Sequence, residues 1–358
     1  MWPFRYGIAC LGVACGSSPT AIIGEPAIVF VSDSSAVYRF EDRNNDAIYD
    51  HQERTEFFTA AASPTGLNSA TGLLALSGTT LLVTNNSRLN ETIPAVNNIL
   101  RLEDLDGDGA ALSVGENQVW FSGFIADGSK IAPISSLTRG ADGAVHAAVR
   151  GYDSTMPDQI YRFFDLTGDG DVDDAGEVTL VTNIEGLAGD IAIDSTAAYW
   201  YVSAIEPPTR YGLFKHESGT TTLVVDTDSL VGESLRLVSS GIDLLNDAPV
   251  FSVGNQENPV RGTLATLRGT ELAMIWTGPS SELSTDFHDF RVLEDGSIIA
   301  VRVATDLYRG PLHRFVDGNG DGDFLDSGEA MRVHDPREAE ANGLPQLRSP
   351  AAVSGSVR

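Results

Sequence analysis

The chain has 358 residues, 42% of them hydrophobic and 36 of them glycine, and its formal net charge is −27. This length is compatible with one large β architecture or two ordinary domains, and the hydrophobic content is ample for a folded core. A chain with this net negative charge lacks the basic surface that DNA or RNA binding needs, and it is poorly suited to docking on anionic lipid. An acidic surface suits divalent cations, which offset part of the self-repulsion.

The first segment, MWPFRYGIACLGVAC, has one arginine, a short apolar run and small residues before Cys15. It predicts a secretory leader over residues 1–15, because the apolar run is far shorter than the roughly 20 residues of a membrane span. LGVAC resembles a bacterial lipoprotein signal, which implies a lipid on Cys15, although Gly12 stands where leucine is usual. The alternative is an N-terminal strand of a cytosolic protein with two free thiols. We expect residues 16–25 to be a linker and residues 26–358 to form one domain of an exported protein, in the bacterial periplasm or at the cell surface.

An acidic segment recurs four times, at residues 37–53, 99–116, 160–177 and 314–329, and holds 21 of the 50 acidic residues. Each copy starts with an arginine between apolar residues, continues with mostly Asp, Asn or Thr at alternate positions and closes with a glutamate. Counting from the first aspartate of the alternating run, the glutamate is at position 13 in three copies and at position 12 in the first. The predicted metal ligands are Asp42, Asn44, Asp46, Asp50, Glu53, Asp104, Asp106, Asp108, Glu116, Asp165, Thr167, Asp169, Asp171, Asp173, Glu177, Asp317, Asn319, Asp321, Asp323 and Glu329.

This pattern resembles the calcium loop of an EF-hand, D-x-[DN]-x-[DN]-G with a late glutamate, but the flanking residues do not predict helices. Calcium binds six to eight oxygens, and alternating carboxylates with a glycine at a sharp turn wrap a chain around such an ion. Without a cation the carboxylates would repel one another, so calcium is favoured over a merely solvated turn. The copy at 99–116 is expected to be the weakest, because no carboxylate lies between Asp108 and Glu116. We therefore expect up to four structural calcium ions.

An apolar segment follows each acidic loop, so each copy predicts a hairpin of two strands. Two further hairpins, at 211–225 and 262–276, lack the acidic residues. The aligned basic residues of all six hairpins are Arg39, Arg101, Arg162, Lys215, Arg268 and Arg314. The five intervals from the first to the last of them average 55 residues. Apolar hairpins with tight polar turns alternate with these, at 72–84, 136–149, 190–202, 241–253 and 289–301.

Four-stranded units at a fixed period predict an all-β, six-bladed β-propeller. The first unit opens with PAIVFVSD and lacks an inner strand, whereas residues 347–357 form a lone apolar strand at the other end. We therefore expect the first blade to be closed by strands from both termini, which removes exposed sheet edges. Two stacked β-sandwiches, the alternative, explain neither the period nor this split unit. The pattern resembles the six-bladed propeller superfamily, which includes the gluconolactonase, NHL-repeat and phytase groups, and the acidic loops resemble those of integrin α-subunits; no single family is identified.

The acidic loops are predicted to join the third and fourth strands of their blades, on the face opposite to the one where propellers usually bind ligands. The other face carries the loops between second and third strands, and scaffolds place function on such loops. Arg150, Arg210 and Arg261 lie there and are candidates for contacting an anionic or polar partner. The alternative, that each arginine pairs with a nearby carboxylate, is equally open.

First strands line the axis of a propeller, and we expect Asp190, His288 and Asp289 near its mouth, among serines such as Ser136. A lactonase-type propeller implies a Glu/Asn/Asn/Asp set around one calcium, and only two carboxylates are found here. His288 and Asp289 are candidates for an acid/base pair, or the histidine is simply hydrogen-bonded in a crowded channel. No P-loop, GxSxG, HExxH or CxxC motif is present. We expect a monomeric binding module for a protein, glycan or small ligand; the alternative is a calcium-dependent hydrolase of a lactone or phosphoester.

Overall fold

The structure is a computed structural model that describes residues 28–32, 36–63, 66–67, 69–86, 97–151, 157–184, 187–203, 212–226, 235–255, 262–269, 271–278, 287–302, 311–335 and 352–356. The predicted leader with Cys15 and the predicted linker lie outside these ranges. Arg210 and Arg261 lie outside them as well, and so does the side chain of His288.

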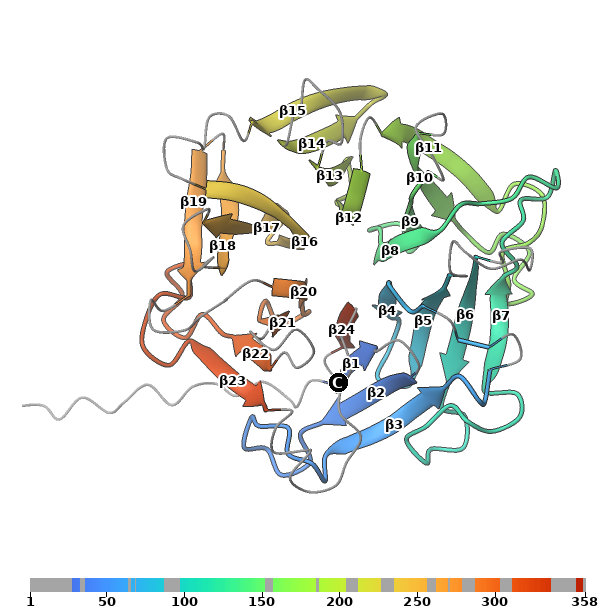
Figure 1. Cartoon of the computed structure of the whole chain (residues 1–358), viewed down its shortest axis with the longest axis horizontal. Coiled ribbons are helices and arrows are strands. Elements are labelled where there is room, and N and C mark those ends of the chain that lie inside the picture. Colours follow the sequence, from blue (N-terminus) through green and yellow to red (C-terminus); the bar gives the residue numbers. More distant parts are fainter. Residues whose placement is uncertain are drawn as a thin grey trace, which may run out of the picture.

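The described strands form six sheets of four antiparallel strands each, arranged as blades in a ring (Figure 1). This confirms the predicted all-β, six-bladed propeller. Within the described ranges, no helix is long and apolar enough to cross a membrane.

The first three blades contain the following strands, from the axis outward. Blade 1 consists of β24 (Ala352–Ser356), β1 (Ile28–Ser32), β2 (Ala36–Glu41) and β3 (Arg54–Thr59). Blade 2 consists of β4 (Leu73–Ala75), β5 (Thr80–Asn85), β6 (Asn98–Glu103) and β7 (Asn117–Phe121). Blade 3 consists of β8 (Ile134–Arg139), β9 (Val145–Val149), β10 (Asp158–Phe163) and β11 (Val178–Ile184).

The other three blades follow the same order. Blade 4 consists of β12 (Leu187–Ile193), β13 (Ala197–Ser203), β14 (Gly212–Glu217) and β15 (Thr220–Asp226). Blade 5 consists of β16 (Leu235–Leu245), β17 (Ala248–Asn255), β18 (Gly262–Arg268) and β19 (Glu271–Thr277). Blade 6 consists of β20 (Phe287–Val292), β21 (Ile298–Arg302), β22 (Leu312–Phe315) and β23 (Ala330–His334). All six aligned basic residues lie in third strands.

The innermost strand of blade 1 comes from the far end of the chain. β24 pairs antiparallel with β1, from Ile28 opposite Ser356 to Ser32 opposite Ala352. Figure 1 shows this strand beside the axis, between β20 and β4. Strands 24 and 1, more than 300 residues apart in sequence, thus share one sheet.

The apolar core is divided among the six junctions between blades. Successive residues of a strand point to opposite faces of the sheet, so each blade packs on two neighbours. In β1, Ile28 and Phe30 join the apolar cluster shared with blade 2, whereas Val29 and Val31 join the cluster shared with blade 6. Burial on both faces explains why the second strands are continuous apolar runs. The same two-sided packing fixes the positions of the loops at each blade's rim.

Candidate metal sites and the axial charge cluster

The four acidic segments form the connections between third and fourth strands of blades 1, 2, 3 and 6, as predicted. We name them loop 1 (residues 42–53), loop 2 (104–116), loop 3 (165–177) and loop 4 (317–329), and we number positions from the first aspartate of each. Blades 4 and 5 have tight turns at the same place, with Ser218 and Gly219 in blade 4.

The first aspartate of every loop accepts two backbone N–H groups from the turn that follows it. In loop 2, Asp104 accepts from Gly107 at 2.8 Å and from Gly109 at 3.0 Å. Loops 3 and 4 repeat these contacts at positions 4 and 6, and in loop 1 Asp42 accepts from positions 5 and 6. In every loop the next aspartates or asparagines of the alternating run accept the amide two residues further on, as Asp106 does from Asp108 at 3.0 Å. The first halves of loops 2, 3 and 4 therefore share one hydrogen-bond pattern, and that of loop 1, which is one residue shorter, is a close variant.

The closing glutamate of every loop is buried and also accepts backbone N–H groups. Glu116 accepts from Leu105 at 3.0 Å with one oxygen and from Ser113 at 2.8 Å with the other. The hydrogen bond from the Ser113 amide is the main reason that the pKa of Glu116 is lowered. The equivalents Glu53, Glu177 and Glu329 are buried and held in the same way. The closing carboxylate thus reaches back from the end of each loop to its beginning.

Two positions in the first half of each loop adopt the left-handed backbone conformation. Glycines at positions 4 and 6 supply it in loops 2, 3 and 4, with φ between 76° and 97°. Loop 1 has Asn45 and Ala47 at these positions, with φ of 60° and 64°. Asparagine tolerates this region and glycine prefers it, but an alanine there is strained. Loop 1 therefore keeps the conformation without the glycines.

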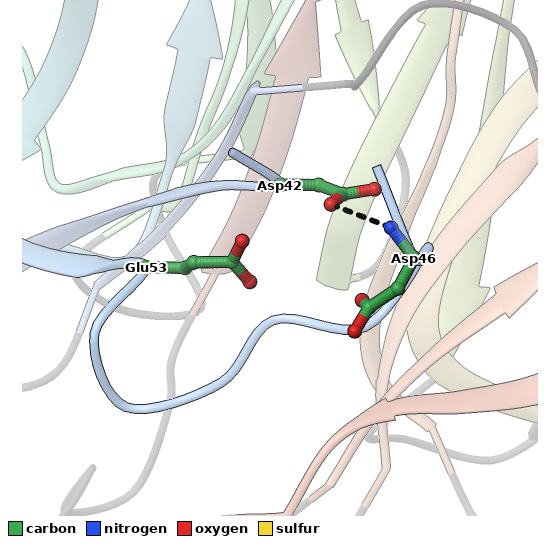
Figure 2. A group of neighbouring side chains, drawn as sticks. All are labelled: Asp42, Asp46 and Glu53. Carbon is green, nitrogen blue, oxygen red and sulfur yellow. Dashed lines mark hydrogen bonds between the residues drawn. The ribbon is translucent and has the colours of Figure 1, made fainter. Parts of the chain in front are cut away.

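In loops 1 and 2, three carboxylates already gather as an ion would require. One oxygen each from Asp42, Asp46 and Glu53 lies within 4.8 Å of the others, and Figure 2 shows the three side chains around a common space. The carboxylates of Asp104, Asp106 and Asp108 gather equally closely. Two oxygens bound to one calcium at about 2.4 Å lie at most about 4.8 Å apart, so both sets fit a hard cation. Loop 2, which we expected to be the weakest, is one of the two best-gathered sets within the described residues.

In loops 3 and 4, other groups engage some of the predicted ligands. One oxygen of Asp173 accepts the backbone N–H of Ser122 in blade 2 at 2.9 Å. The side-chain amide of Asn319 donates to Asp321 at 3.0 Å and to Asp326 at 2.5 Å. This amide brings partial positive charge between two carboxylates, where a cation would bring a full one.

On the opposite face, Arg150 is exposed at the end of β9, and its backbone N–H donates to Pro133 at 2.7 Å. Arg210 and Arg261, the other arginine candidates of this face, lie outside the described residues. The ligand face thus remains a prediction.

The axis holds a buried charge cluster that includes two of the predicted channel residues. Arg291 of β20 donates to Asp190 of β12 at 2.7 Å, and the same nitrogen lies 3.3 Å from Asp289. Asp190 also accepts the Ile242 amide of β16 at 3.1 Å, and Asp243 of β16 accepts the Val292 amide of β20 at 2.8 Å. Carboxylates on the inner strands therefore connect blades 4, 5 and 6 across their junctions.

The electrostatics of this cluster keep the arginine charged and make one carboxyl a weaker acid. Burial alone would lower the pKa of Arg291, but the carboxylates of Asp190, Asp289 and Asp243 raise it. Desolvation raises the pKa of Asp243 to about 6, against the opposing effect of Arg291. Asp243 and Arg291 were not among the residues that we expected at the axis. Asp243 lies two residues after position 241, which aligns with Asp190, and Arg291 lies two residues after Asp289. Residues two apart in a strand lie on the same side of it.

Comparisons with known proteins add only distant structural likenesses. No family model matches the chain, and no curated protein matches it. A puromycin-hydrolyzing peptidase of Mycobacterium tuberculosis is 15% identical with a TM-score of 0.48, over 90% of this chain and 44% of the peptidase. This chain thus spans less than half of that protein. The periplasmic gluconolactonase of Pseudomonas aeruginosa is 13% identical with a TM-score of 0.42, over 93% of this chain and 100% of the other. The calcium-binding protein regucalcin of Agrobacterium tumefaciens is 13% identical with a TM-score of 0.41, over 72% of each chain.

Proposed function

We propose that this chain is an exported calcium-binding propeller that serves as a binding module, with structural calcium in loops 1 to 4. The observation that carries the calcium proposal is the shared hydrogen-bond pattern. In all four loops, backbone amides hold the first aspartate and the closing glutamate in place, and in two loops three carboxylates gather around one point. Preorganised oxygens of this kind suit a hard divalent cation.

The binding proposal is supported by the division of the two faces. The acidic loops occupy the rim of one face, and the loops between second and third strands lie on the other, where Arg150 is exposed. An exposed arginine on this face is a candidate contact for an anionic or polar group of a partner, and the net charge of −27 disfavours a nucleic acid. A screen of glycans, peptides and organophosphates against the purified chain would identify the ligand class, and Arg150→Ala would test the face.

The alternative, a calcium-dependent hydrolase with its ion on the axis, is less well supported. Such an ion would need Asp190 and Asp289 as ligands, and the guanidinium of Arg291 lies between these two carboxylates. An arginine in that place already supplies the positive charge that the ion would bring. We therefore favour calcium at the rim.

Calcium titration of the chelator-treated chain tests the proposal, with thermal unfolding measured in parallel. An ion that binds only the folded state stabilises it by about 2.7 kcal/mol per site at a concentration of 100 Kd, so we expect the melting temperature to rise by several degrees. Asp165→Ala, Asp169→Ala or Asp321→Ala should each abolish part of this rise. Glu271→Gln is the matched control, because Glu271 is an exposed acid outside the loops. A titration without binding, and melting indifferent to calcium and chelator, would refute the calcium proposal.

A further inference from the structure

Each acidic loop contacts the blade before its own at one backbone position. The N–H of position 8 donates to a carbonyl in the outermost strand of the preceding blade. The four pairs are Tyr49 to Val333 at 2.6 Å, Ala111 to Phe57 at 2.7 Å, Val172 to Trp120 at 3.0 Å and Phe324 to Ile275 at 2.7 Å. The contact therefore recurs at four of the six junctions.

The four accepting residues share a structural feature, a β-bulge in the outermost strand. In β3, Phe58 lies opposite Val37 and Glu56 lies opposite Tyr38, so Phe57 between them has no partner in the ladder. The register shifts in β7, β19 and β23 single out Trp120, Ile275 and Val333 in the same way. A bulged residue is left out of its own sheet, which frees its carbonyl for a neighbour. Here the neighbour is the next blade's acidic loop.

The side chain at position 8 strengthens the contact, because it enters the apolar cluster of that same junction. Tyr49, Ala111, Val172 and Phe324 are between 0% and 3% exposed, whereas other apolar residues of the same loops, such as Leu105, Leu166 and Leu325, are more than half exposed. Each belongs to the apolar cluster that contains its backbone acceptor. Phe324, for example, meets Phe315 edge to face with ring centroids 6.0 Å apart.

Side chains add hydrogen bonds between three of the loops and the preceding blades. Asp173 of loop 3 accepts the backbone N–H of Ser122 at 2.9 Å. Arg268 of blade 5 donates to the carbonyl of Gly322 in loop 4 at 3.2 Å. The His334 ring nitrogen of blade 6 donates to the carbonyl of Tyr49 in loop 1 at 2.8 Å.

We propose that the acidic loops are cation-dependent clasps, in which the ion of one blade secures the junction to the blade before it. This inference rests on the proposed calcium binding. Position 8 lies between the early ligands, at positions 1, 3 and 5, and the closing glutamate. An ion that draws these two groups together fixes the segment between them, whereas unscreened carboxylates would push it apart. The fixed segment then keeps its amide on the bulge and its side chain in the junction.

Blades 3 and 4 supply an internal comparison, because the blades that follow them have no acidic loop. Their outer strands have the same bulge, at Val181 in β11 and Val224 in β15. Val181 is 37% exposed, whereas Phe57, Ile275 and Val333 are at most 1% exposed. We therefore expect calcium to stabilise the four junctions that have an acidic loop. The other two junctions, which blade 4 makes with blades 3 and 5, should not respond to calcium.

Hydrogen exchange of the whole chain, with and without calcium, tests this inference. Saturating calcium should slow exchange at the amides of position 8 and at Ser122, on the order of 100-fold at 100 Kd if loop opening controls exchange. Amides of β11 and β15 should change little. In Asp169→Asn, protection should be lost at Val172 and at Ser122 of the preceding blade, while the other three clasps stay protected. Glu271→Gln should behave as the unchanged chain does.

The outcomes separate this inference from the proposal beneath it. If calcium binds but Asp169→Asn loses protection only within β10 and β11, the ion braces its own hairpin and the clasp is refuted, while calcium binding stands. If calorimetry detects no calcium binding, both are refuted. Loss of protection at Ser122 in Asp169→Asn, with calcium binding reduced by one ion, supports both.

Discussion

Truncating Phe324 to alanine should weaken the junction between blades 5 and 6 without removing a single metal ligand. The Phe324 side chain is 2% exposed and packs in one cluster with Ile275, Trp276 and Phe315. Phe-to-Ala substitutions in such cores cost about 3–5 kcal/mol, from lost transfer free energy and the cavity left behind. The edge-to-face contact with Phe315 accounts for about 0.5–1.5 kcal/mol of this. We expect a loss of about 3–5 kcal/mol in the free energy of unfolding.

Guanidinium unfolding at saturating calcium measures this loss, and Leu325→Ala is the matched control. Leu325 is the next residue of the same loop but is 57% exposed, so its truncation should change stability by no more than about 0.5 kcal/mol. Calcium titration of both variants checks that the ion still binds. Equal stability of Phe324→Ala and Leu325→Ala would show that loop 4 is not anchored in the junction, and the argument for the clasp would fail.

Two further predictions concern loop 1 and the axis. Ala47→Gly should stabilise the chain by about 0.5–1 kcal/mol, because relief of the strain at a φ of 64° outweighs the entropy that glycine adds to the unfolded chain. Thermal melting measures the change, with Ala60→Gly as the control that should lose stability. A lower melting temperature for Ala47→Gly would contradict the prediction. Because folding raises the pKa of Asp243 to about 6, its stabilising contribution is present below the ordinary carboxyl pKa and is lost as pH rises through about 6. Asp243→Asn should remove a decline on the order of 2 kcal/mol between about pH 4 and pH 7, seen in unfolding midpoints, and an unchanged slope would contradict the assignment.

The propeller could be predicted from the sequence because its signals are local and repeated. One basic residue marks the third strand of every blade, from Arg39 to Arg314, and the acidic loops follow it in four blades. Short apolar runs and tight turns such as Ser218–Gly219 are properties of neighbouring residues. Repetition lets weak local signals reinforce one another, which a single unit would not allow.

The axial cluster could not be predicted in the same way, because it depends on contacts between distant strands. Asp190 and Arg291 are 101 residues apart and meet only when the ring closes. Nothing near Asp243 in sequence indicates that its carboxylate accepts the amide of Val292 in the next blade. Asp190 and Asp289 were expected near the mouth of the channel, whereas Asp243 and Arg291, two residues further along their strands than the aligned positions, were not.

The contacts between each acidic loop and the preceding blade could be predicted only in part. The loop sequence contains the residue that makes the contact, but the surface that it contacts belongs to a distant part of the chain. All four loops have an apolar or aromatic residue at position 8, but tyrosine, alanine, valine and phenylalanine differ widely in size. Other apolar residues of these loops, such as Leu105 and Leu166, are exposed, so apolarity alone indicates neither which position is buried nor against which surface. The partner is a bulge in the preceding blade, and a bulge cannot be seen from the sequence of the loop that covers it.

The contacts at the axis and the contacts of the acidic loops connect different pairs of blades around the ring, except that both connect blades 5 and 6. Axial carboxylates connect blade 4 to blade 5 and blade 5 to blade 6, whereas acidic loops connect blade 5 to blade 6 and onward to blades 1, 2 and 3. Between blades 3 and 4, Ser136 stands where blade 4 has Asp190, and a two-residue turn stands where other blades have a loop. What packs there is an apolar cluster that includes Ile160, Ile184 and Trp200. Because no acidic loop reaches this cluster, its contribution should not depend on calcium, whereas the His216 ring, 6.1 Å from that of Trp200, leaves it open to pH. This junction is therefore a calcium-independent reference for the four junctions that have an acidic loop.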